Sequence, residues 1–125
     1  MAAEKNFEIK VKKYLDECGA WYIKYWGGAP YTKSGIPDLL VSSNGQFLGI
    51  EIKADKGEPS LLQLHHLKKI RDSGGYGILL YPKDFNEFKK FNEHKLKSSR
   101  WYLSNVKEQH EWRRRLEERD ERRTD

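Results

Sequence analysis

Hydrophobic residues recur along the chain at two spacings, and these spacings predict an alternation of helices and strands. Within residues 4–18, Phe7, Val11 and Leu15 lie at helical spacing. Gly19 follows directly and is typical of the position just beyond a helix. The chain is therefore expected to begin with an amphipathic helix.

Two further segments are short and apolar, which is typical of strands. Residues 21–26 are mostly aromatic, and residues 76–82 form an apolar run that ends in proline. Residues 27–37 hold too many glycines and prolines for a helix or a strand, so we expect a loop there.

The other segments complete a mixed α/β pattern. Residues 60–73 and 84–96 read as helices, residues 100–104 as a short edge strand or a loop, and residues 105–125 as a charge-rich helix with little apolar surface. The order is α-β-β-β-α-β followed by additions, which predicts a small mixed central sheet flanked by helices. We expect one domain over 1–104 and a charged helical extension over 105–125.

A hairpin is predicted between residues 37 and 53. Asn44 and Gly45 separate two apolar runs, which is the strongest short-range signal for a two-residue type I′ turn. This register places Asp38 directly opposite Glu51, with Cβ atoms about 4.5–5.5 Å apart. Lys53 points to the same face. A bulge would shift the pairing by one residue. The other face is apolar throughout and consists of Leu39, Val41, Leu48, Ile50 and Ile52.

Two facing carboxylates repel each other unless one gains a raised pKa or a cation lies between them. Mg²⁺ prefers oxygen ligands and is commonly held by one or two carboxylates together with substrate phosphates. Lys53 is placed to stabilise charge that develops on a phosphate. The plainer interpretation is that Asp38 caps a turn while Glu51 and Lys53 form an ion pair on an exposed strand.

Composition narrows the classes of function. The 125 residues carry a formal net charge of +5 and a pI of about 9.2. Residues 107–125 contain equal numbers of basic and acidic side chains, so the excess positive charge belongs to the rest of the chain, as a nucleic-acid surface requires. A single cysteine excludes an internal disulfide framework and the zinc-finger classes. With no apolar run long enough to span a bilayer and no signal-peptide pattern, we expect a cytoplasmic protein without a membrane partner.

The string Gly-Ile-Pro-Asp38, followed by Glu51-Ile-Lys53, resembles the signature of the PD-(D/E)XK nuclease superfamily. The fuller string GIPDLL…GQFLGIEIKADKGEPSLLQ is similar to the stand-alone VRR-NUC nucleases of phages and prophages. Archaeal Holliday-junction resolvases are similar in layout. The resemblance covers about residues 4–82 and does not extend to 105–125.

The resemblance implies a site that depends on Mg²⁺ or Mn²⁺. It makes Asp38 and Glu51 the carboxylate ligands of the metal, and the backbone carbonyl of Ile52 a further ligand. Lys53 corresponds to the catalytic lysine.

The family also implies two supporting residues on helices. Gln63 matches a glutamine that supports the site or contacts substrate, although an ordinary exposed helix residue is the alternative. A glutamate on the first helix reaches the metal through water, and Glu8 fits this role better than Glu4 because it borders the apolar face.

Four residues near the hairpin are candidates for contacting the DNA backbone. They are Tyr31, Lys33 and Ser34 in the loop before Asp38, and Lys56 after the hairpin.

We therefore expect a metal-dependent DNA endonuclease that selects branched or junction DNA in a bacterial or phage-infected cell. One site per chain calls for a homodimer when two strands are cut. The alternatives are a restriction-type endonuclease, a non-catalytic DNA-binding module on the same fold, or a structural protein that acts through its terminal helix.

Overall fold

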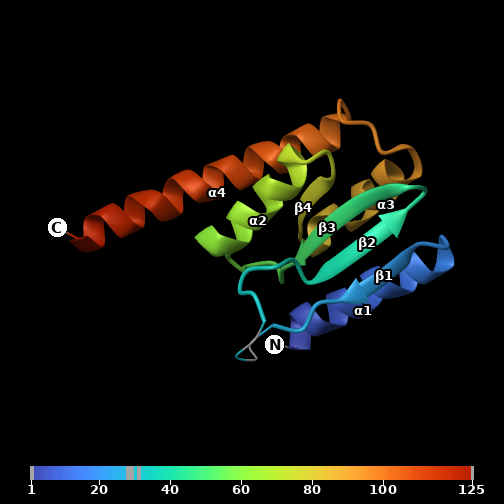
Figure 1. Cartoon of the computed structure of the whole chain (residues 1–125), viewed down its shortest axis with the longest axis horizontal. Coiled ribbons are helices and arrows are strands. Elements are labelled where there is room, and N and C mark those ends of the chain that lie inside the picture. The colour runs from blue at the N-terminus through green and yellow to red at the C-terminus, as the bar shows by residue number, and fades with distance from the viewer. Residues whose placement is uncertain (1, 28–29, 31, 125) are drawn as a thin grey trace.

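The chain folds into helices and strands in the predicted order, as a computed structural model shows (Figure 1). The structure describes residues 2–27, 30 and 32–124. Its elements are α1 (Ala2–Glu17), β1 (Trp21–Lys24), β2 (Leu39–Ser43), β3 (Gln46–Ile52), α2 (Leu61–Asp72), β4 (Tyr76–Leu80), a 3₁₀ turn (Pro82–Asp84), α3 (Phe85–His94) and α4 (Arg100–Thr124).

The four strands form one mixed sheet in the order β1-β2-β3-β4. The first three strands pair antiparallel, and β4 lies parallel to β3. Leu39 is opposite Ile50, which confirms the register predicted from the turn. Asn44 and Gly45 both have positive φ, at 50° and 78°, as a type I′ turn requires.

One face of the sheet packs against α1 and α3. The apolar stripe of α1 meets the alternate side chains of the hairpin that were predicted to face the core, and aromatic residues of α3 close this layer. Its buried members include Phe7, Val11, Leu15, Leu39, Val41, Leu48, Ile50, Ile52, Ile78, Leu80, Phe88 and Phe91.

The opposite face is covered by α2 over β3 and β4. Glycines in these two strands allow the helix to approach closely. A Cβ atom built on Gly77 would lie 2.3 Å from the main-chain oxygen of Leu67 on α2. Leu67 is completely buried against Leu79 and Tyr81. This contact fixes the height of α2 above the sheet.

Residues 100–104 are helical, so the predicted edge strand or loop is wrong. They form the first turns of α4, and Ser99 accepts a hydrogen bond at its side chain from the Tyr102 amide, at 3.4 Å. Trp101 and Tyr102 then lie about one helical turn before the buried Asn105 and two turns before the buried Gln109. The aromatic residues favour a strand when considered alone, but their contacts with α3 and β4 decide in favour of a helix.

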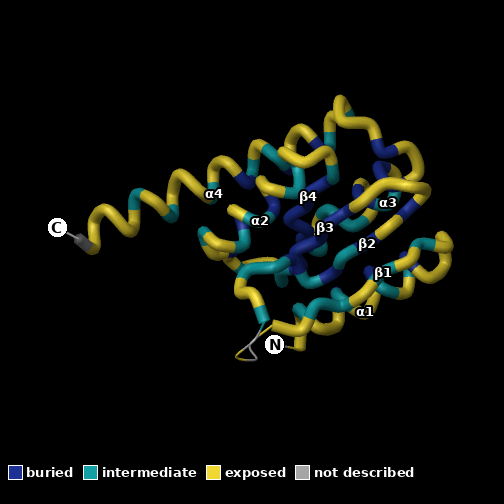
Figure 2. Tube along the Cα trace, in the orientation of Figure 1, coloured by how far each residue is buried: buried dark blue, intermediate teal, exposed yellow. Residues whose placement is uncertain are grey.

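The polar residues of this helix complete the free edge of β4. Asn105 accepts a hydrogen bond from the Leu79 amide at 3.1 Å and donates to the Leu79 carbonyl at 2.8 Å. Gln109 donates to the carbonyl of Gly77 at 2.8 Å. The distal part of α4 extends beyond the rest of the protein and is largely exposed (Figure 2). Within the described residues, neither α4 nor any other helix is both long and apolar enough to cross a membrane.

We expect Gly77→Ala to destabilise the protein by about 1–3 kcal/mol, because the added methyl group must push α2 away from β4. Gly27→Ala is the matched control, since no atom of the part of the chain that the structure describes, apart from its chain neighbours, lies within 4 Å of a Cβ atom at Gly27. Urea unfolding followed by circular dichroism measures both changes. Equal unfolding midpoints for the two variants would contradict this account of the packing.

Candidate active site

Asp38 is fixed at the end of the hairpin by three interactions. Its main-chain oxygen accepts a hydrogen bond from the Tyr25 amide at 2.8 Å. Its Oδ2 atom accepts one from the Ile52 amide at 2.7 Å, and its Oδ1 atom lies 3.2 Å from Nζ of Lys24. The pairing of the two strands ends with Leu39 opposite Ile50, so Asp38 and Glu51 are the residues directly beyond the last pair, and the charge of Asp38 acts on Glu51.

Glu51 is a buried carboxylate, with only 2% of its surface exposed. Its Oε1 atom is buried and has no hydrogen-bond partner among the described residues, while Oε2 lies 3.3 Å from Nζ of Lys53. Burial raises the pKa of Glu51 to about 8; the negative charge of Asp38 adds to this rise, and Lys53 opposes it. The plainer interpretation is therefore right about the ion pair between Glu51 and Lys53 and wrong about its surroundings, because the strand is buried at Glu51.

Lys24 joins the first helix to this site, and the sequence analysis did not identify it. Its ammonium group lies 2.7 Å from Oε1 of Glu8 and 3.2 Å from Oδ1 of Asp38. Burial opposes the charge of Lys24, but the hydrogen bonds and charges of the two carboxylates raise its pKa above the usual value. For Glu8, burial likewise opposes ionisation, and hydrogen bonds from Lys24 and Lys12 prevail and lower its pKa.

The first helix therefore brings Glu8 to the same lysine that Asp38 contacts, and its role toward a metal stays a prediction. The signal that could have revealed Lys24 is its position in β1. Lys24 lies two residues after the half-buried Tyr22, so both side chains are on the inward face of β1, where a lysine is unusual.

A cavity of about 260 Å³ beside Asp38 brings in part of the preceding loop and the start of α2. Lys33 and Ser34 line it from the loop, and Gln63 lines it from α2. Gln63 also closes a capping box, because its side-chain oxygen accepts a hydrogen bond from the Ser60 amide at 2.9 Å. Gly35 has a φ of 77° and touches Leu62, so the loop lies directly against α2.

The remaining candidates lie elsewhere. Lys56 borders a different hollow, together with Tyr81 and Trp112. Glu4 lies one helical turn before Glu8 and takes no part in the ion pairs around Lys24. Tyr31 lies outside the described residues.

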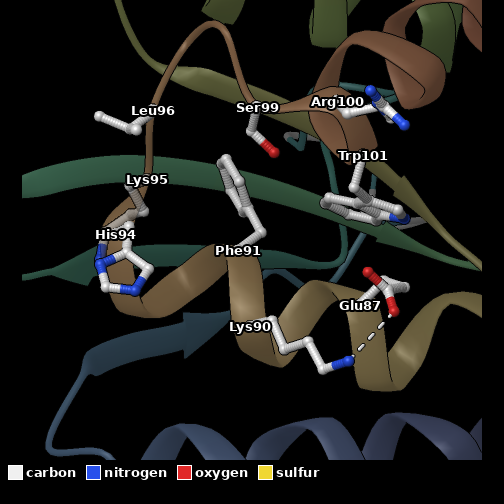
Figure 3. Close-up of a pocket in the computed structure, with 9 residues that line it drawn as sticks. All are labelled: Glu87, Lys90, Phe91, His94, Lys95, Leu96, Ser99, Arg100 and Trp101. Atoms are coloured by element: carbon white, nitrogen blue, oxygen red, sulfur yellow. Dashed lines mark hydrogen bonds and ion pairs between the residues drawn. The ribbon is translucent and has the colours of Figure 1, made fainter.

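A hollow with a largely apolar wall lies between α3 and the start of α4 (Figure 3). The rings of Phe91 and Trp101 line it, and Lys90 forms an ion pair with Glu87 at its side at 3.4 Å. None of the predicted site residues contributes to this hollow, which separates it from the candidate active site.

The donor atoms at the hairpin end suit a small divalent cation. Asp38 and Glu51 supply carboxylate oxygens, and the unpartnered Oε1 atom of Glu51 needs a positively charged neighbour. The N–H and C=O groups of a strand residue point to the same side, so the Ile52 carbonyl faces Asp38 as its amide does. Within the described residues no cluster of three or more His, Cys, Asp or Glu side chains is suited to a metal. Asp38 and Glu51 are two carboxylates, and two carboxylates together with phosphate and water are a common way to hold a small divalent cation.

Comparison with known proteins identifies one family. The sequence model described as archaeal Holliday junction resolvase matches residues 2–118, which is nearly the whole chain. The expectation that the likeness does not extend into residues 105–125 is therefore wrong, because the match includes most of α4. No curated protein and no solved structure gives a significant match. The resemblance to Holliday-junction resolvases within the PD-(D/E)XK superfamily is thereby confirmed, whereas the closer likeness to VRR-NUC nucleases stays a prediction.

We expect the pH dependence of stability to reveal the buried carboxyl of Glu51. Glutamate in an unfolded chain ionises near pH 4.5, whereas folded Glu51 keeps its proton up to a pKa of about 8. Between these values the folded state binds the extra proton, so the stability of the wild type falls as the pH rises. Glu51→Gln cannot titrate and should gain at least about 1 kcal/mol relative to the wild type between pH 5 and pH 8.

Urea unfolding in EDTA at the two pH values measures this change. Glu58→Gln, which alters an exposed carboxylate, is the control and should follow the wild type. Parallel profiles for Glu51→Gln and the wild type would show that Glu51 is ionised throughout this range.

Proposed function

Because the chain belongs to the archaeal Holliday junction resolvase family, we propose that it is a metal-dependent endonuclease that cuts four-way or otherwise branched DNA. Family membership implies a nuclease acting on DNA. The observation that carries the proposal is the meeting of Asp38, Glu51 and Lys53 at one end of the hairpin. A non-catalytic DNA-binding module has no need of a buried carboxyl group next to a second, half-buried one.

Asp38, Glu51 and the carbonyl of Ile52 are the residues that would hold Mg²⁺ or Mn²⁺. When bound, such an ion polarises the scissile phosphate and lowers the pKa of a coordinated water. The chain itself supplies the orientation. The Ile52 amide holds one oxygen of Asp38 in place, and the surrounding strands keep bulk water away from Glu51.

Lys53 contributes a positive charge beside the reacting phosphate. Its side chain is only 12% exposed, so the charge acts through a medium that screens it less than bulk water does. We assign Lys53 to stabilising the negative charge that grows on the phosphate oxygens as the attacking water adds.

Glu8 and Lys24 support this arrangement from the side of α1. Lys24 bridges Glu8 and Asp38, and its positive charge offsets part of the repulsion between the two carboxylates. Glu8 is thereby placed to hold a water that reaches the metal. Gln63 borders the cavity next to Asp38 and is placed to contact the substrate there.

DNA would approach over the loop and hairpin end. Lys33 and Ser34 are exposed beside the Asp38 cavity, and Lys56 is exposed after the hairpin, so all three are accessible to backbone phosphates. The net charge of +5 supports such an approach because phosphate contacts release bound cations.

A four-way junction must be cut on two strands, and each chain offers one carboxylate pair, so we propose a homodimer. An apolar patch on β1 and the start of β3, on either side of β2, supports this proposal. Trp21, Ile23 and Phe47 lie there with 65%, 44% and 44% of their surfaces exposed. Trp21 and Phe47 both lie beside Ser42 in the paired strands. Such a patch suits an interface in which two copies bury the same face.

Cleavage of a labelled four-way junction should require Mg²⁺ or Mn²⁺ and stop in EDTA. Lys53→Ala should fold, bind the junction normally and cut at least about a hundredfold more slowly, because it lacks only the charge that stabilises the transition state. Single-turnover cleavage at saturating DNA isolates this step. Lys56→Ala is the matched control and should change binding rather than rate. Undiminished cutting by Lys53→Ala, or by the wild type in EDTA, would refute the mechanism.

For the dimer, we expect Trp21→Glu and Phe47→Glu each to shift the protein toward the monomer, since a buried unpaired charge is costly at an apolar interface. Light scattering after size-exclusion chromatography gives the mass. Leu103→Glu, at an exposed apolar residue of α4, should leave the mass of the wild type unchanged. A monomeric wild type would remove this part of the proposal.

A further inference from the structure

Lys53 is held by more than its ion pair with Glu51. Its amide donates a hydrogen bond to the Leu80 carbonyl at 3.0 Å, which attaches its backbone to the end of β4. Its aliphatic stem packs against the turn that follows. A Cβ atom built on Gly57 would lie 3.3 Å from both Cβ and Cδ of Lys53, so the turn touches the stem along its length.

The buried hydroxyl group of Tyr81 anchors this turn. The Gly57 amide closes the turn onto the Ala54 carbonyl at 2.9 Å. The carbonyl of Gly57 then accepts a hydrogen bond from the hydroxyl of Tyr81 at 2.8 Å. Tyr81 directly follows Leu80 in the chain, so neighbouring residues fix both the backbone and the stem of Lys53.

Tyr81 is itself held firmly. It is only 4% exposed and packs with Leu67 of α2 and Leu79 of β4, while Trp112 of α4 covers the cluster from outside. Tyr81 and Trp112 also line a hollow of about 250 Å³ with the turn. α4 reaches the turn a second time, because Arg119 lies 2.7 Å from a carboxylate oxygen of Glu58.

We propose that Tyr81 is a positioning residue for Lys53: its hydroxyl fixes the 54–57 turn against the lysine stem, and α4 holds Tyr81 in place. This inference rests on the proposed function, in which Lys53 acts on the phosphate. The hydroxyl does not touch the substrate. It restricts where the Lys53 ammonium can lie, and a displacement of a charged group by a fraction of an ångström is sufficient to slow catalysis.

Tyr81→Phe removes the hydroxyl and keeps the buried ring. We expect single-turnover cleavage of a four-way junction to fall about tenfold with no change in junction affinity. The matched control is Tyr76→Phe at the other end of β4. Tyr76 is equally buried, and its hydroxyl also donates to a backbone carbonyl, that of Lys95. Each variant loses one buried hydrogen bond, yet Tyr76→Phe should cut at the rate of the wild type.

A double-mutant cycle tests whether Tyr81 acts through Lys53. In a Lys53→Ala background, Tyr81→Phe should cause no further loss of rate, because the group that it positions is absent. Gly57→Ala, whose methyl group presses on the Lys53 stem, should slow the wild type by a similar factor. A normal rate for Tyr81→Phe, or a second tenfold loss in the Lys53→Ala background, would overturn the inference.

A measurement without cleavage separates this inference from the proposed function. In protein labelled with ¹³C-lysine, relaxation of the side-chain methylene groups of Lys53, assigned by their loss in Lys53→Ala, reports the order of the stem. The order should decrease in Tyr81→Phe and not in Tyr76→Phe. An unchanged order in Tyr81→Phe overturns the inference even when cleavage follows the proposed function. A decreased order together with a wild-type rate for Lys53→Ala supports the contact and removes the catalytic role.

Discussion

The register of one hairpin determines where the chemistry of this protein can lie. Asn44 and Gly45 adopt the positive φ angles of a two-residue turn, and every pair down the two strands follows from that turn. A shift of one residue would place Glu51 among the core side chains and turn Ile50 outward. Core packing and site assembly are thus two consequences of the same constraint. The apolar face cannot be buried correctly unless Asp38 and Glu51 also meet.

This constraint explains why the sequence predicted the central part of the fold so well. Turn chemistry and alternation are local signals, and both are strong between residues 37 and 53. The prediction for residues 100–104, at the start of α4, was wrong because its local signals are weak. The inward face of this helix carries Asn105 and Gln109, which look like surface residues in the sequence but complete the hydrogen bonds of the exposed edge of β4. A helix whose buried stripe is partly polar shows no clear hydrophobic period, and only the tertiary structure reveals what those side chains bond.

The residues of the candidate site also fall into two groups, those that local sequence signals place and those that only tertiary packing places. Asp38, Glu51 and Lys53 are close because of local register, so their placement follows from the sequence. Lys24 comes from a different strand, and its position between Glu8 and Asp38 depends on the packing of α1 against the sheet. Gln63 was selected by resemblance, and the structure adds that the same residue caps α2, since Ser60 and Gln63 form a reciprocal pair. Its place beside Asp38 therefore follows from where that helix begins.

An otherwise apolar strand has to accommodate the buried carboxyl group of Glu51, and this is costly. A carboxyl group with a pKa near 8 and an unpartnered buried oxygen opposes folding at neutral pH, and an apolar residue would fit the surrounding layer better. Lys53 relieves only part of this cost because it reaches one oxygen of the pair. In the proposed function, the partner for the other oxygen is a cation that arrives after folding. Binding of that cation then stabilises the folded state and releases the proton that burial had retained. The buried charge is thus unfavourable for the fold taken alone and favourable for a site that must attract a divalent ion to the end of a hairpin.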